Sequence, residues 1–386
     1  MNKPYRTWCE VSLDAIEHNY NEFRKILSPN TKFMGVVKAD GYGCGAYETA
    51  CVLEHCGADF LGVAFIDEAI ELRQKGITLP MLILGYTSPV FADDLVKYDI
   101  IPTVESIAFA KKLSKSAVSC NKMAKIHVKV DTGMSRLGYR FNLTSINEII
   151  AVSQLPNIEI NGIFTHFACA DEDNGMTQVQ FTMFQCMLEG LADLHIPIKH
   201  CCNSAAAMRY ANMQLDMVRV GISLYGFYPS DEKYNLDLIP AMQLKSTVTS
   251  IRFIEKGDTV SYGAIIKAKE KMKIATVSAG YADGFTRMLT NKAKVIVNGN
   301  FLPVVGRICM DQCMIDASSV NNISVEDEVT LFGRQNGSEI TVEEIAKAIG
   351  TVNYELLCDI GRRVPRSYTR RGQIIHIQNY LLTNDA

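Results

Sequence analysis

The feature of this sequence that most restricts its fold is a change of pattern near residue 240. Before that point, short runs rich in β-branched residues alternate with helical patterns, at spacings of roughly 20–40 residues that suit strand–helix units. The runs are FMGVVKA (33–39), FLGVA (60–64), PMLILG (80–85), IIPTV (100–104), KIHVKVD (125–131), IEINGIFTHF (158–167), IKHCCNS (198–204) and MVRVGISLYG (217–226). Such runs are typical of buried parallel strands, and eight of them predict an α/β fold with a (β/α)8 TIM barrel.

Two of the intervening segments carry clear helix signals. Residues 67–75 end at Gly76, a typical residue after a helix C-terminus. Residues 177–191 place Phe181, Phe184, Leu188 and Leu191 on one stripe. A doubly wound sheet is the alternative fold, but no G-x-G-x-x-G follows the first run, which favours the barrel.

After residue 240, short strand patterns with glycine-containing turns predict a mainly β C-terminal domain. One helix is expected within it, because Thr341 and Glu344 form a T-x-x-E capping box and Gly350 stands at the expected end. The first strand candidate, residues 6–13, precedes the barrel and is expected to pair with this later domain. We therefore predict a leading strand in 1–12, a barrel in 13–238 and a β-rich domain in 239–386.

The composition excludes several classes of protein. The 386 residues include 39 basic and 42 acidic side chains, so there is no basic surplus to neutralise nucleic-acid phosphates. Neither a signal peptide nor an apolar run long enough to span a membrane is present, so we expect no membrane partner. The 12 cysteines form no C-x-x-C pair and no zinc-type spacing. These features predict a cytoplasmic protein with reduced thiols and no metal site.

Lys38 is the first candidate for chemistry. It stands at the C-terminal end of the first predicted barrel strand, where barrel enzymes keep their active sites. Apolar neighbours would lower the pKa of its amine, which suits a Schiff base with an aldehyde cofactor. Gly41, Gly43 and Gly45 would permit tight backbone turns beside it. From position alone, a lysine that ends a strand simply to reach water remains the alternative.

A set of motifs around and beyond Lys38 resembles the alanine racemases, which are pyridoxal-phosphate enzymes with a barrel and a β domain. The matching segments occur in the family's order: KADGYG (38–43), KVDTGMSRLG (129–138), THFACAD (165–171), NSAAAMR (203–209), MVRVGISLYG (217–226), SYG (261–263), GYADGF (280–285), VGRICMDQ (305–312) and VNYE (352–355). Together they extend along nearly the whole chain.

The resemblance implies the catalytic pair. Lys38 would hold pyridoxal phosphate as a Schiff base and act as the base on one face of the substrate Cα, and Tyr262 would act on the opposite face. A racemase needs two such groups, because a proton leaves one face and arrives at the other. A phenol is a weak base near neutral pH, and His166 and Arg219 are the family candidates for assisting it and for orienting the cofactor.

Arg219 would face the pyridine nitrogen of the cofactor. Arginine stays protonated, so it can donate a hydrogen bond to that nitrogen without giving up a proton. The ring would then be a weaker electron sink than one held by an aspartate, which would favour return of the proton to Cα over transamination.

The resemblance also implies binding residues. The cofactor phosphate would be held by Ser204 after the seventh strand, by the backbone N–H groups of Gly221 and Ile222 after the eighth, and by the hydroxyls of Tyr42 and Tyr354. The substrate carboxylate would be bound by Arg136, Met310 and Asp311. Lys129 matches a family lysine that is often carbamylated. The substrate's access route would be lined by Tyr281, Asp171, Arg287 and Arg307.

Tyr262, Met310 and Asp311 follow Lys38 by more than 200 residues. The resemblance implies that they enter the site from the second subunit of a homodimer with shared active sites. Asp40, Gly41 and Cys44 depart from the family's usual Asn, Ala and His, which leaves the shape of the lysine turn open.

The expected activity is interconversion of L- and D-alanine, which supplies D-alanine for peptidoglycan. A serine or broad-specificity racemase is the nearest alternative, although Tyr354 would crowd a side chain larger than alanine's. A barrel-plus-β decarboxylase and a non-catalytic pyridoxal-phosphate carrier are further alternatives. The first would place an acid where Arg219 stands, and the second would resemble only the barrel half.

Overall fold

The computed structural model of the protein describes residues 6–172, 174–232 and 234–382. The chain divides into two compact units. We name residues 15–41 and 46–239 the barrel unit. The β unit consists, among the described residues, of 6–14, 42–45 and 240–382. The short segment 42–45 belongs to the β unit although it lies just after Lys38 in the sequence, which the sequence patterns did not indicate.

The barrel unit contains the eight predicted parallel strands within its described residues. They are β2 (Lys32–Val36), β3 (Phe60–Val63), β4 (Met81–Ile83), β5 (Thr103–Val104), β6 (Ala124–Asp131), β8 (Ile158–Phe164), β9 (Ile198–His200) and β10 (Met217–Val220), with the two-residue β7 (Tyr139–Arg140) beside β6. They form two four-stranded runs, β10-β2-β3-β4 and β5-β6-β8-β9. Backbone hydrogen bonds join the runs: Arg219 donates to Cys202 O (3.0 Å), and Ile83 donates to Ile101 O (2.9 Å). The sheet therefore closes into the predicted barrel.

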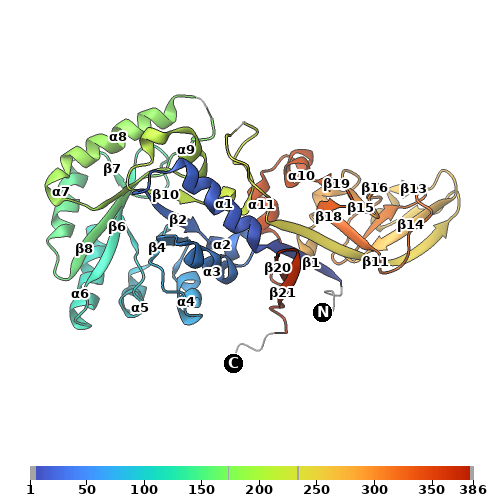
Figure 1. Ribbon diagram of the computed structural model, residues 1–386, viewed down its shortest axis with the longest axis horizontal. Coiled ribbons are helices and arrows are strands. Elements are labelled where there is room, and N and C mark those ends of the chain that lie inside the picture. Colours follow the sequence, from blue (N-terminus) through green and yellow to red (C-terminus); the bar gives the residue numbers. More distant parts are fainter. Residues whose placement is uncertain (1–5, 173, 233, 383–386) are drawn as a thin grey trace. The chain divides into compact units, whose positions relative to one another are not determined.

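Helices connect these strands and lie outside them (Figure 1). They are α1 (Leu13–Ile26), α3 (Ala46–Cys56), α4 (Ile66–Gln74), α5 (Ala92–Lys97), α6 (Ile107–Ser119), α7 (Leu143–Ser153), α8 (Met176–Gly190) and α9 (Ser204–Arg209), with short 3-10 turns η1 (Pro89–Phe91), η2 (Ala192–Leu194), η3 (Ala211–Met213) and η4 (Ile222–Tyr225). The helices predicted over 67–75 and 177–191 are confirmed to within one residue. In α8, Met187 is fully buried and Leu188 is only half-buried, which corrects the predicted stripe.

An apolar cluster fills the barrel interior. Its members come from different strands and are at most 6% exposed: Met34, Phe60, Leu82, Ile101, Phe164, Ile198 and Met217. Burial of these side chains drives closure of the sheet. Because the interior is solid, room for a ligand is confined to the ends of the strands.

The β unit is built on a ten-stranded sheet. Its strands are β1 (Thr7–Ser12), β11 (Met242–Ile254), β14 (Met272–Val277), β15 (Lys294–Val297), β16 (Asn300–Pro303), β17 (Cys313–Asp316), β18 (Glu328–Gln335), β19 (Ser338–Ile340), β20 (Arg366–Arg370) and β21 (Gln373–Gln378). The leading strand β1 pairs antiparallel with β11 and parallel with β20. A separate hairpin joins β12 (Thr259–Val260) to β13 (Ile266–Lys267).

The predicted capping box is confirmed at α10 (Val342–Ile349). The Glu344 N–H donates to Thr341 Oγ1 (3.1 Å), and Gly350 adopts the left-handed conformation after the helix. The expectation of one helix in this unit was wrong, because a second helix, α11 (Asn353–Cys358), follows. It has no side-chain N-cap hydrogen bond, so the sequence carried no start signal for it. Three 3-10 turns complete the unit: η5 (Tyr262–Ala264), η6 (Tyr281–Asp283) and η7 (Arg287–Leu289).

Across the described ranges, no helix combines the length and the apolar character needed to cross a membrane.

Candidate active site

The site residues predicted in the barrel unit lie at the C-terminal ends of its strands. Lys38 follows β2, His166 follows β8, and Arg136 lies in the loop after β6. Ser204 follows β9, while Arg219 lies in β10 and is followed at once by Gly221 and Ile222. In a closed parallel barrel these ends form one mouth, so the ends of five strands bring these residues together there.

Lys38 opens a turn of unusual backbone conformation. Ala39, Asp40, Gly41 and Tyr42 all have positive φ angles, between 52° and 62°. These residues lie within α2 (Lys38–Tyr42), and the left-handed conformation costs Ala39, Asp40 and Tyr42 about 1–2 kcal/mol each. Interactions around the turn must offset that strain.

A carboxylate that we did not predict supports the turn. Glu68, at the start of α4, accepts a hydrogen bond from the Ala39 N–H at one oxygen and from the Ala64 N–H at the other, each at 2.7 Å. Asp40 Oδ1 accepts from the Ala46 N–H (3.1 Å), so this departure from the family's pattern caps the start of α3. These contacts fix the path of the backbone after β2 and so the position of Lys38.

Arg219 is the most enclosed cation of the barrel mouth, with only 3% of its surface exposed. One terminal nitrogen donates to His200 Nδ1 (3.0 Å), and the other lies within hydrogen-bond distance of Cys201 O (2.9 Å), Thr165 O (2.8 Å) and His166 Nδ1 (3.3 Å). Burial lowers the pKa of Arg219 to about 10, so it remains a cation at neutral pH. It is held by neutral acceptors rather than by a carboxylate.

His166 lies among cations. Burial is the main cause of a pKa far below the ordinary histidine value, and Arg219, Lys129, Arg136 and Lys38 each lower it further. Since arginine only donates, the lone pair of Nδ1 faces Arg219 and the proton lies on Nε2. The mouth thus presents concentrated positive charge around a neutral imidazole.

Lys129 adds to that charge only when it is protonated. Its Nζ lies 4.2 Å from the centre of the Phe164 ring. Burial first, and then Arg219 and Arg136, hold the pKa of Lys129 well below its usual range. Neutral amines in such surroundings are nucleophilic.

The two strand ends predicted to bind phosphate lie together. The Gly221 N–H donates to Ser204 Oγ (2.9 Å), which leaves the Ser204 hydroxyl hydrogen for another acceptor. α9 begins at Ser204 and η4 begins at Ile222, so backbone N–H groups of both first turns are available. An anionic group with a phosphate at one end and a neutral ring nitrogen to accept from Arg219 fits this donor set.

In the β unit, Tyr42 and Tyr354 lie near each other, with ring centroids 6.2 Å apart. Tyr42 is buried and Tyr354, on α11, is half-buried. The segment that carries Tyr42 is tied to the unit by the fully buried Arg366, whose Nε donates to Gly43 O (3.0 Å). The structure therefore brings together the two predicted phosphate-binding tyrosines.

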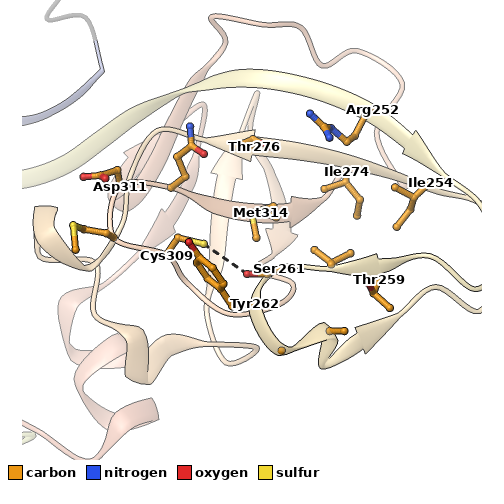
Figure 2. A pocket seen from close by; sticks show the side chains of 15 residues that line it. Arg252, Ile254, Thr259, Ser261, Tyr262, Ile274, Thr276, Cys309, Asp311 and Met314 are labelled. Atoms are coloured by element: carbon orange, nitrogen blue, oxygen red, sulfur yellow. Dashed lines mark hydrogen bonds between the residues drawn. The ribbon is translucent and has the colours of Figure 1, made fainter.

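Tyr262, Met310 and Asp311 line one broad cavity of about 1050 Å³ in the β unit. Figure 2 shows Tyr262 beside Ser261 and Cys309, with Asp311 at the same end of the cavity and Ile254 and Thr259 at the other. Tyr262 is 68% exposed and Met310 is 53% exposed. Exposed large side chains at the wall of an open cavity are typical of a surface that binds a ligand or another protein.

A buried carboxylate organises the loop of Met310 and Asp311. Asp283 is fully buried and receives hydrogen bonds from Arg6 and from the Gly280 N–H, while Arg363 lies 3.2 Å away and also donates to Asp311 Oδ1 (2.8 Å). Backbone N–H groups of the same turn donate to the carbonyls of Cys309 and Met310, each at 3.0 Å. The GYADGF motif (280–285) therefore fixes the backbone of Cys309 and Met310, which line the cavity.

The residues expected along the access route divide between the units. Asp171 lies in the barrel unit, and Tyr281, Arg287 and Arg307 lie in the β unit. Arg307 is adjacent to the Tyr262 turn, because a Cβ built on Gly263 would lie 3.0 Å from its guanidinium. Among the residues that the structure describes, no group of three or more His, Cys, Asp or Glu side chains could hold a metal ion.

Sequence reasoning missed the residues that hydrogen-bond to the predicted site residues or to the loops that carry them: Glu68, His127, Gln180, His200, Asp283 and Arg363. Gln180, for example, is fully buried on α8, where its amide accepts from the Ala168 N–H (2.8 Å) and contacts His166 O (3.3 Å). A polar residue within the apolar stripe of a predicted helix was the available signal, since buried amides require partners.

Comparison with known proteins agrees with this arrangement. Residues 11–229 match the family model "Alanine racemase, N-terminal domain", and residues 241–368 match "Alanine racemase, C-terminal domain". The chain is 44% identical to an alanine racemase of Clostridium kluyveri over an alignment of 392 positions that covers 100% of both chains. It is 46% identical to one from Methanococcus maripaludis over 366 positions, covering 94% of this chain and 98% of the other.

Solved structures give the same result. Alanine racemase of Clostridium difficile 630 in complex with cycloserine superposes with a TM-score of 0.93 at 44% identity, covering 99% of this chain and 100% of that one. The enzyme of Bacillus anthracis with bound L-Ala-P superposes with a TM-score of 0.93 at 35% identity, covering 99% of each chain. Both halves of the chain are matched in sequence and in fold, and the chain belongs to the alanine racemase family.

Proposed function

We propose that this chain interconverts L- and D-alanine with pyridoxal phosphate bound at the barrel mouth. The observation that carries the proposal is Arg219, a buried guanidinium held by carbonyls and neutral imidazoles. A cation that cannot give up its proton at neutral pH is the group expected beside a ring nitrogen that must stay unprotonated.

When bound, pyridoxal phosphate supplies an aldehyde for an amine and a conjugated ring that makes the substrate Cα–H acidic. Lys38 would provide the amine. The Ser204 hydroxyl and the N–H groups of Gly221 and Ile222 would hold the phosphate, with the hydroxyls of Tyr42 and Tyr354 as further donors. Arg219 would donate a hydrogen bond to the ring nitrogen.

Two groups move the proton at Cα. Lys38 takes or returns it on one face, and Tyr262 does so on the other. This opposition makes the reaction a racemisation, because a single base would return the proton to the face it left. His166, neutral with its proton on Nε2, is a hydrogen-bond donor for this machinery.

The substrate carboxylate is oriented by Arg136, by the Met310 N–H and by Asp311. The guanidinium offers paired donors that match a carboxylate. Tyr354 limits the space beside Cα and favours the methyl side chain of alanine over that of serine.

We further propose a homodimer in which each site takes Lys38 from one copy and Tyr262 from its partner. The exposure of Tyr262 and Met310 on an open cavity supports this, because an exposed phenol in bulk water is poorly placed for proton transfer. A second copy that covers the cavity would exclude that water. The test is Tyr262→Phe mixed with Lys38→Ala: exchange of subunits should restore one intact site per mixed dimer.

We also predict a cytoplasmic protein without nucleic-acid or membrane partners. The 12 cysteines form no C-x-x-C pair, and such cysteine usage is common in compartments where thiols are kept reduced.

The activity test uses the purified holoenzyme with L-alanine and with L-serine in D2O, following optical rotation and loss of the α-hydrogen. Equal formation of both alanine enantiomers with deuterium at Cα is expected, and a faster reaction with serine would refute the alanine preference. Lys38→Ala should abolish both directions. Tyr262→Phe should impair racemisation while cofactor binding persists, and unchanged rates in that variant would exclude Tyr262 as the second base.

A further inference from the structure

Two buried histidines extend the hydrogen bonding of Arg219 away from the mouth and into the barrel. His200 Nδ1 lies 3.0 Å from an Arg219 terminal nitrogen, and His200 Nε2 lies 2.9 Å from His127 Nδ1. Both imidazoles are fully buried. The three side chains come from β10, β9 and β6 and form one continuous line.

The direction of every hydrogen bond in this line follows from the arginine. A guanidinium has donors and no acceptor, so His200 Nδ1 must accept and His200 must carry its proton on Nε2. That N–H points at His127 Nδ1, which must accept in turn. His127 is then protonated on Nε2. Burial lowers the pKa of His127 to about 3 and lowers that of His200 well below the ordinary value, so both rings are neutral at neutral pH.

Packing prevents the rings from adopting another arrangement. The Phe164 ring stacks on His200 with centroids 4.7 Å apart and an angle of 10° between the planes. His127 lies over Gly162 on β8, where an added Cβ would be 2.5 Å from its Nδ1. Glycine in a strand interior commonly marks such a close approach. The hydrogen bond between the two histidines thus passes over the one strand that separates β6 from β9.

The second ring nitrogen of His127, Nε2, shows that this arrangement costs free energy of folding. Its Nε2 is buried and has no hydrogen-bond partner of normal length among the residues that the structure describes. The Asn161 side chain interacts with the same ring and, as a hydrogen-bond partner, opposes the lowering of its pKa. A phenylalanine would fill this buried position without an N–H that needs a partner, so filling of space does not explain a histidine here.

We propose that His127 is a positioning residue for the active site: it accepts the N–H of His200 and thereby keeps the other His200 nitrogen free to accept from Arg219. Without His127, the His200 N–H would face an apolar cavity, and the ring would gain by moving its proton to Nδ1 or by turning. Either change would set an N–H against the guanidinium and displace it. The effect on rate rests on the proposed function, whereas the protonation pattern does not.

The direct test is NMR of histidine-labelled holoenzyme, with two-bond 1H–15N correlations that distinguish protonated from unprotonated ring nitrogens. The His200 signals are assigned by their loss in His200→Asn. We expect Nε2 protonated and Nδ1 unprotonated in His200, and the same pattern in His127. A His200 ring protonated on Nδ1 would overturn the proposal whatever the enzyme's activity.

Two variants test the positioning role. His127→Leu removes the acceptor, and His127→Gln offers an amide oxygen in its place. We expect His127→Leu to disturb the His200 signals and to lower kcat about 10-fold, equivalent to about 1.4 kcal/mol, with little change in KM. His127→Gln should recover most of both losses. Phe60→Leu is the control, because that ring packs on His127 with centroids 5.9 Å apart and has no polar atom.

Three outcomes separate the possibilities. Unchanged His200 signals and kcat in a folded His127→Leu would show that His127 only fills space and would overturn the proposal. Equal losses in His127→Leu, His127→Gln and Phe60→Leu would do the same. If the expected signals are found in a protein that does not racemise alanine, the proposed function fails while the assignment of the histidines stands. If His127→Leu does not fold, the proposal is still tested by the protonation of His200 in the wild-type spectrum and by the His200 signals and kcat of His127→Gln.

Discussion

Removal of the Glu68 carboxylate should release the backbone turn that positions Lys38. Ala39, Asp40 and Tyr42 are held in the left-handed region at a combined cost of about 3–6 kcal/mol. Glu68 offsets that cost by accepting from the N–H groups of Ala39 and Ala64. Two charge-assisted bonds contribute at most about 3–6 kcal/mol together, and less where a carboxylate is half-buried and reaches water. The support and the strain are therefore of similar size.

We expect Glu68→Ala to lower the free energy of unfolding by about 2–4 kcal/mol in urea titrations. Glu68→Gln keeps one acceptor oxygen and should lose about half as much. Glu71→Ala is the matched control on the same helix, since Glu71 forms an ordinary i,i+4 pair with Lys75 on the surface and should matter by about 0.5 kcal/mol.

Hydrogen exchange gives the local readout. The amides of Ala39 and Ala64 should lose protection in Glu68→Ala and keep it in Glu71→Ala. The kcat of Glu68→Ala should fall, by up to about 100-fold if Lys38 moves by an ångström. Should Glu68→Ala match Glu71→Ala in stability and in protection of both amides, the turn is supported by something other than this carboxylate.

Three further predictions concern the barrel interior. Gly162→Ala would set a Cβ 2.5 Å from the His127 ring and should destabilise the fold by about 1–3 kcal/mol, measured by thermal denaturation. Gly361 has open space around it, so the control Gly361→Ala should leave the thermal stability unchanged. Since the folded-state pKa of His127 is depressed, its contribution is present above the unfolded value of about 6.5 and is lost as pH falls toward about 3. Between pH 7 and pH 5, the free energy of unfolding of the wild-type protein should therefore fall by about 2 kcal/mol more than that of His127→Gln in urea titrations. Equal decreases in the two proteins would contradict the lowered pKa of His127. Lys129, whose amine pKa is held well below its usual range by burial and by Arg219 and Arg136, should form a carbamate with dissolved CO2, seen as a 13C signal from labelled bicarbonate that is missing in Lys129→Ala.

The barrel was predictable because each strand carries a local signature. Eight apolar, β-branched runs separated by helical patterns specify parallel strands without knowledge of their neighbours. The T-x-x-E sequence at Thr341 likewise specifies a helix start through hydrogen bonds three residues apart. Candidates such as Lys38 and Arg219 followed from motifs that resemble a family, and their places at strand ends followed from the barrel.

What could not be predicted depends on partners distant in sequence or on conformations that propensity disfavours. The order of β6, β8 and β9 follows from the predicted barrel, but no local pattern shows that His127 and His200 meet across β8, where Gly162 leaves room for the His127 ring. The left-handed turn at Ala39 and Asp40 opposes the ordinary preference of L-residues, so no statistical signal announces it. Only the surrounding contacts, such as those of Glu68, make that conformation stable.

The pairing of β1 also has a consequence for biosynthesis. This strand leaves the ribosome well before its partners β11 and β20, which are translated more than 200 residues later, a delay on the order of 10–50 s for β11 alone. Throughout that interval the nascent chain exposes Trp8, Cys9 and Val11, which are at most 3% exposed in the finished fold. Trp8 is the single tryptophan of the sequence, so its fluorescence would report the moment at which β1 is enclosed by its later-made partners.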